Sequence, residues 1–85
     1  LSRSLAEARR LVAAGMLDSE EIISVVTKMI AAEKAARIDY VKICHQQTLA
    51  DQAVVDDDAV LLLAVFIGKT RLIDNSFLRG KSGLL

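Results

Sequence analysis

Eight consecutive apolar residues, 60–67, constrain the fold of this chain more than any other stretch of its sequence. A run of this length that ends at a glycine, Gly68, is typical of a β-strand buried on both faces. It is far shorter than the roughly 20 apolar residues that a membrane-spanning helix needs. Gly68 permits a sharp turn because it has no Cβ to clash at positive φ. We therefore predict that residues 60–67 form the middle strand of a sheet and that residues 71–77 return beside it as a hairpin.

The size and charge of the chain limit the classes of protein to which it can belong. Its 85 residues suffice for one small domain, and 53% of them are hydrophobic, which is enough for a core. Eleven acidic residues balance eleven basic ones, which argues against a general nucleic-acid binder and against polybasic attachment to a membrane. With Cys44 as its one cysteine the chain cannot form an internal disulfide, and this fits a reducing compartment such as the cytoplasm.

Two amphipathic helices are expected before the sheet. Residues 1–14 carry apolar side chains at the spacing of one buried stripe, and Gly15 suits the left-handed position just past a helix end. Asp18 or Ser19 then caps a second helix. The apolar side of this second helix follows the helical period as far as residue 33. Because the chain begins without Met inside a helical pattern, we interpret it as a piece of a longer protein.

A first strand is predicted over residues 37–45, which are rich in β-branched and aromatic side chains. Strict alternation along a strand places Ile38, Tyr40 and Cys44 on one face and Val41 with Ile43 on the other. Residues 46–58 read as a connection, with a short extended piece near residues 54 and 55. The predicted fold class is therefore α+β, a helical hairpin packed on a small three-stranded antiparallel sheet.

The stretch Gly68-Lys69-Thr70 copies the end of a phosphate-binding P-loop. The full signature also needs a glycine five residues earlier, where this chain has Leu63, and a helix after the threonine. Residues 71–73 resemble a strand instead. A hairpin turn with a soluble lysine at its tip is the better interpretation.

The remaining metal-ligating and nucleophilic side chains do not form a catalytic or metal-binding set. Cys44 and His45 are neighbours on a predicted strand, so their side chains point to opposite faces. One histidine and one cysteine cannot make a zinc site. The run of three aspartates at residues 56–58 lacks the spacing of a calcium loop and is interpreted as a solvated connection.

Polar residues around the predicted hairpin leave two interpretations open. Arg71 and Asn75 share one strand face with Ile73, whereas Asp74 lies on the other. Together with Lys69 they can face a ligand or a second domain. They can equally pair with each other and with their neighbours on the surface of this domain.

Read together, three stretches resemble the C-terminal domain of the pantoate–β-alanine ligase family, the pantothenate synthetases. They are residues 5–15, residues 38–41 followed after a short gap by residues 48 and 49, and, most specifically, residues 64–75. The resemblance covers residues 1–78. Residues 45–47, His-Gln-Gln, depart from an Asp-Pro turn that is common in the family, and the tail 79–85 has no counterpart.

The resemblance implies a role in the ATP-driven condensation of pantoate and β-alanine through a pantoyl adenylate. In the family, a larger N-terminal nucleotide-binding domain carries the catalytic motifs, binds ATP and magnesium, and makes most dimer contacts. That domain is absent from this chain, so no catalytic or metal-binding residue can be carried over and the isolated chain is expected to be inactive. Residues 1–78 would form a lid over the active site, with Lys69 and Arg71 as candidate contacts to the triphosphate. The alternative is a free-standing α+β module that binds a partner protein.

Overall fold

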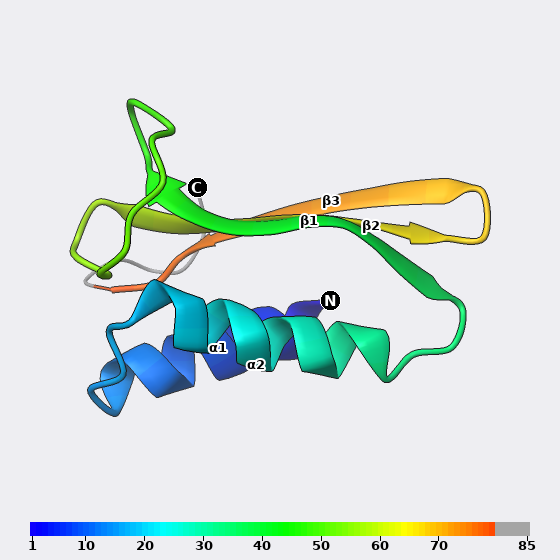
Figure 1. Ribbon diagram of the computed structural model, residues 1–85, viewed down its shortest axis with the longest axis horizontal. Helices are drawn as coiled ribbons and strands as arrows, with labels where there is room; N and C mark the ends of the chain where they lie inside the picture. The colour runs from blue at the N-terminus through cyan, green and yellow to red at the C-terminus, as the bar shows by residue number, and fades with distance from the viewer. Residues whose placement is uncertain (80–85) are drawn as a thin grey trace.

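The computed structural model describes residues 1–79, which form two layers (Figure 1). One layer holds the helices α1 (Ser2–Ala13) and α2 (Ser19–Ala31). The other is an antiparallel sheet of β1 (Ala36–His45), β2 (Ala59–Ile67) and β3 (Thr70–Phe77). The predicted helical hairpin on a three-stranded sheet is confirmed. Of the predicted tail 79–85, all but Arg79 lies outside the described residues.

Strand β2 is the middle of the sheet, as its apolar sequence predicts, because the strand order is β1-β2-β3. The turn that follows it contains only Gly68 and Lys69, since Ile67 pairs directly with Thr70. Gly68 has a φ of 61°. A positive φ at the first turn residue alone is the geometry of a type II′ hairpin turn, which glycine adopts without strain.

The core lies between the sheet and the helices. Alternate residues of β2, including Leu61, Leu63 and Val65, meet Ile22 and Val26 of α2, and all five are fully buried. On the sheet face that is turned away from the helices, here called the open face, a smaller cluster joins Cys44, Val60 and Phe77. Strand β2 is thus buried on both faces, by the helices on one side and by side chains of its neighbouring strands on the other.

The helix ends follow the sequence closely, with one difference. Asp18 caps α2, and its side chain accepts hydrogen bonds from the backbone N–H groups of Glu20 at 2.9 Å and Glu21 at 3.4 Å. Gly15 follows α1 with a φ of 101°. Helix α2 ends at Ala31, however, so the prediction that its period continues to residue 33 overruns the helix.

A β-bulge at Asp39 corrects the predicted faces of β1. Ile38 pairs with Val65 and Tyr40 with Ala64, so Asp39 is an extra residue in the strand. The bulge moves Ile38 to the helix side, where it packs against the core. The prediction that Ile38 shares a face with Tyr40 is therefore wrong, because strict alternation does not count the extra residue.

The connection between β1 and β2 is held at two points, once to strand β1 and once to the link between the two helices. Isolated bridges join Cys44 to Asp51 and Asp18 to Val54. The second bridge confirms the short extended piece that the sequence predicts near residues 54 and 55. Within residues 1–79 neither helix has the length and apolar character that a membrane crossing demands.

Candidate functional site at the hairpin end of the sheet

Lys69 and Arg71, the two site residues predicted from sequence, belong to the hairpin in which β2 turns into β3. Figure 1 shows this hairpin turn at one end of the sheet. Lys69 is exposed at the second turn position and makes no ion pair with any residue of the described range 1–79. Arg71 is engaged on the domain's own surface. Its Nη2 and Nε donate to Asp39 Oδ2 at 2.8 Å and 3.1 Å. Of the two open interpretations, surface pairing therefore holds for Arg71.

A row of three side chains crosses the open face beside this turn. Phe66 pairs with Arg37 on one side and with Arg71 on the other. The Arg37 guanidinium carbon lies 4.5 Å from the centre of the Phe66 ring, which is cation–π distance. Arg71 also lies 6.0 Å from the Tyr40 ring. The row presents two arginines whose planes are held by aromatic and carboxylate partners.

Arg37 and Asp39 are the two members of this site that the sequence analysis missed. The resemblance held a signal for Asp39, because it rests on residues 38–41 as well as on residues 64–75. The structure joins these stretches directly through the ion pair between Asp39 and Arg71. The antiparallel register was needed to place Arg37 opposite Phe66.

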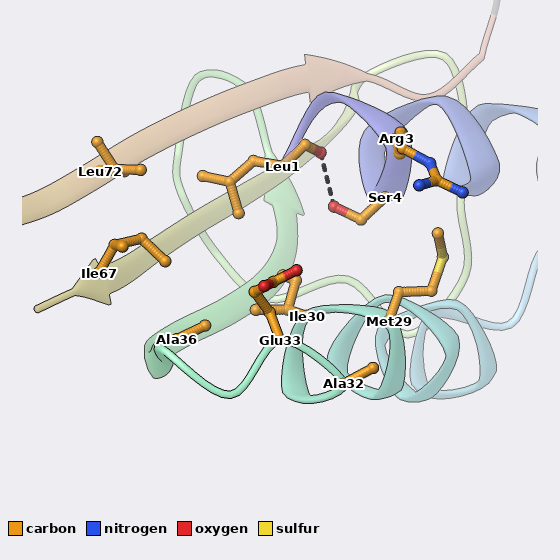
Figure 2. Close-up of a pocket in the computed structure, with 10 residues that line it drawn as sticks. All are labelled: Leu1, Arg3, Ser4, Met29, Ile30, Ala32, Glu33, Ala36, Ile67 and Leu72. Carbon is orange, nitrogen blue, oxygen red and sulfur yellow. Dashed lines mark hydrogen bonds between the residues drawn. The ribbon is translucent and has the colours of Figure 1, made fainter.

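An open groove of about 550 Å³ lies at the same end on the helix side of the sheet. Figure 2 shows Leu1, Met29, Ile67 and Leu72 around it, contributed by the residue that precedes α1, by α2 and by strands β2 and β3. Arg3 and Glu33 add charge to its lining. The N-terminal residue is fixed here, since Ser4 Oγ donates to the Leu1 carbonyl at 2.7 Å. The hairpin end therefore has a basic surface on one side of the sheet and a mainly apolar groove on the other.

Cys44 and His45 do not form a reactive pair, as the strand geometry predicts. Cys44 is fully buried on the open face of the sheet, and this burial raises the pKa of its thiol. His45 is the last residue of β1, and its Nδ1 accepts from the Gln47 backbone N–H of the following turn at 3.1 Å. Its Nε2 lies 3.6 Å from Asp58 Oδ2. The histidine therefore organises a turn.

The three aspartates of the acidic run have three separate roles in the connection. Asp56 Oδ1 accepts from the Asp58 backbone N–H at 2.8 Å, while Asp57 faces Arg79 at 3.6 Å and Asp58 faces His45. Hydrogen bonds from Gln52 and from that backbone N–H lower the pKa of Asp56. Within residues 1–79 no three acidic, histidine or cysteine side chains gather as a metal site would require.

The P-loop alternative fails on geometry, because Thr70 begins strand β3 at the position where the signature requires a helix. The described residues define a class of protein: a two-layer α+β domain with a cluster of basic side chains at one end of its sheet. The sequence places it more narrowly. The model of the family described as pantoate-beta-alanine ligase matches residues 1–77, and the chain belongs to that family.

Relatives of the chain bear this out. The pantothenate synthetase of Syntrophus aciditrophicus is 45% identical over 75 residues, which is 88% of this chain and 26% of that protein. That of Pelotomaculum thermopropionicum is also 45% identical, over 92% of this chain and 28% of its own length. A crystal structure of the Thermus thermophilus pantothenate synthetase superposes with a TM-score of 0.85 at 26% identity, over 94% of this chain and 29% of that one. The chain thus spans about a quarter of the length of the relatives that it matches.

Proposed function

We propose that residues 1–78 are the C-terminal lid domain of a pantothenate synthetase, and that the domain closes over an active site carried mainly by a separate nucleotide-binding domain. The observation that carries the proposal is the coverage: relatives of that name match 88% of this chain or more, but the chain spans only 26–28% of them. Residues 1–78 are similar to part of those enzymes along nearly their whole length, and they bring together no set of catalytic side chains. A domain of this kind suits an accessory role.

The chemistry of the reaction explains why such a domain is useful. The ligase joins pantoate to β-alanine by first forming a pantoyl adenylate, an activated acyl group that water destroys. Closure of a lid excludes water and strengthens electrostatic contacts to the phosphates. The residues of this chain that suit the role are Lys69 at the turn and Arg71 beside it, because both put positive charge at one end of the domain.

The same proposal assigns the remaining partners. Residues 1–79 offer no group of three or more ligands for magnesium, so the metal and most contacts to ATP fall to the nucleotide-binding domain. We also assign to that domain the contacts of a homodimer. A cytoplasmic location belongs to the proposal, since the reaction draws on ATP and Cys44 is a free thiol.

Substitution of the two cations in the full-length enzyme tests the lid role. We expect Lys69→Ala and Arg71→Ala each to raise the KM for ATP or to lower kcat several-fold, because a contact to the phosphates is lost. Lys28→Ala on the exposed side of α2 is the control, and it should leave both constants unchanged. Steady-state kinetics with varied ATP gives the answer. If all three variants match the parent enzyme, these residues do not contact the nucleotide.

A further inference from the structure

The hairpin end of the sheet concentrates positive charge in a small area of the open face. Arg37 and Arg71 flank Phe66 in one cross-strand row, and Lys69 lies two residues before Arg71 in the adjoining turn. Asp39 is the acidic residue bound to this group, through Arg71. Three cations and one carboxylate leave a local charge of about +2.

The two arginines are held in place before any ligand arrives. Arg37 lies over the Phe66 ring at 4.5 Å. Asp39 Oδ2 accepts hydrogen bonds from two N–H groups of Arg71. A guanidinium has five N–H groups, so three are left to donate to a ligand. Preorganised guanidinium groups bind phosphate oxygens strongly, because little side-chain freedom is lost on binding.

The spacing of the row favours an extended anion. Neighbouring strands lie about 4.8 Å apart, so the backbones of Arg37 and Arg71 are about 10 Å apart with Phe66 between them. Each guanidinium is tied to a different partner, the ring or the carboxylate. A chain of linked phosphates spans such a pair better than one phosphate does.

We propose that Arg37, Lys69 and Arg71 bind a phosphoanhydride anion on the open face, and that Asp39 competes with this anion for Arg71. The proposal adds Arg37 as a ligand-binding residue and Asp39 as the residue that limits affinity. It rests on the proposed function only for the natural source of the anion, the triphosphate of ATP. The chemistry of the site itself is independent of that source.

Neutralising Asp39 gives a test with a definite sign. Asp39→Asn keeps an oxygen that can accept from Arg71 but removes the negative charge next to the bound anion. We expect the Kd for inorganic tripolyphosphate to fall about threefold or more at low ionic strength. Asp51→Asn is the matched control, because it makes the same change of charge beside Lys42 near the opposite end of β1. It should change the Kd much less.

The arginines supply the opposite test. Arg37→Gln and Arg71→Gln should each raise the Kd about threefold or more, while Lys28→Gln on α2 should not. Amide NMR titration of the 85-residue chain with magnesium-free tripolyphosphate gives each Kd and maps the shifted residues. The spectrum of each variant also reports whether it remains folded. The shifts should cluster at Arg37 and at residues 66–71.

Several outcomes would overturn the anion site. Equal effects of Asp39→Asn and Asp51→Asn would mean a response to net charge alone, and so would shifts spread over all cationic residues. ATP should bind about as tightly as tripolyphosphate, and AMP more weakly. If AMP matched ATP, recognition would lie in the nucleoside and the proposal would be wrong.

The lid role can fail separately from the anion site. If Arg37→Gln weakens tripolyphosphate binding in this chain but leaves the KM for ATP of the full-length ligase unchanged, the anion site stands and its use in the ligase is excluded. If the KM rises while the isolated chain shows no localised binding, the lid contact stands and the preformed anion site is excluded.

Discussion

At the scale of single residues, Cys44 and His45 have opposite environments although they are neighbours in the sequence. Cys44 is buried beside Val60 on the open face, whereas His45 holds the turn after β1 through its Nδ1. The period of a strand predicts this separation. The sulfur is therefore a small packing group whose ionisation is opposed by its surroundings.

The buried thiol makes the free energy of unfolding depend on pH in the alkaline range. Because burial raises the pKa of Cys44 above its ordinary value of 9.0, the unfolded chain loses the thiol proton at a lower pH than the folded protein does. The stability that this difference contributes is complete below pH 9.0 and is lost as the pH rises through the folded pKa.

Comparison with Cys44→Ala isolates that contribution. We expect the free energy of unfolding of the parent chain to fall more steeply above about pH 9 than that of the variant, since other groups titrate alike in both. Urea denaturation between about pH 8 and about pH 10 measures the two curves. Curves that stay parallel over this interval would show that the thiol ionises equally in both states.

At the scale of secondary-structure elements, the two-residue turn sets the register of the β2–β3 hairpin. Gly68 has a φ of 61°, and a Cβ built there has no other heavy atom within 4 Å. The space is open, so only the backbone conformation opposes a side chain at this position. Substitution of this glycine therefore measures backbone strain without a steric clash.

We expect Gly68→Ala to lower the free energy of unfolding by about 1 kcal/mol, the cost of the left-handed conformation for an L-residue. Lys69→Ala serves as the control, because the second turn residue is outside that region. It should change stability by no more than about 0.5 kcal/mol. Thermal or urea denaturation compares the two. A neutral Gly68→Ala variant would mean that the turn relaxes to another type.

The elements also show what sequence patterns can predict in this chain and what they cannot. The apolar run of β2, the glycine turn and the Asp18 cap are local signals, and each predicts its element correctly. The bulge at Asp39 has no local signal, because it depends on how β1 pairs with β2. The glycine turn is a local signal, so Lys69 and Arg71 could be placed at the hairpin from the sequence. The partner of Arg71 and the position of Arg37 depend on how β1 pairs with β2, so they could not be predicted.

At the scale of the whole molecule, the stability of the domain rests mainly on the hydrophobic core between the sheet and the helices. A chain of this size buries only about 60% of the surface that its unfolded state exposes, so its stability is small. Leu61 is fully buried between the sheet and the helices, whereas Leu49, in the connection after β1, is 56% exposed. The two leucines form a matched pair for measuring what the core contributes.

Leu61→Ala should cost about 2–5 kcal/mol, through lost burial and the cavity that remains. Leu49→Ala, with the same chemical change on the surface, should cost less than about 0.5 kcal/mol. Because small domains have about 5–15 kcal/mol in total, this loss should lower the melting temperature of the first variant by about 10 °C or more. Circular dichroism during thermal denaturation checks both. Equal melting temperatures would contradict the central position of β2.

The unequal lengths of the two sheet connections favour one order of assembly for the sheet. Two residues close the β2–β3 hairpin, whereas the thirteen residues 46–58 separate β1 from β2. The chain entropy lost on closing the longer loop exceeds that of the shorter one by about 1.7 kcal/mol. We therefore expect the hairpin to form first and β1 to join it later, with α2 packed against it. In that order of events, the apolar strand at the centre of the mature sheet would be an edge strand early in folding, before β1 pairs with it.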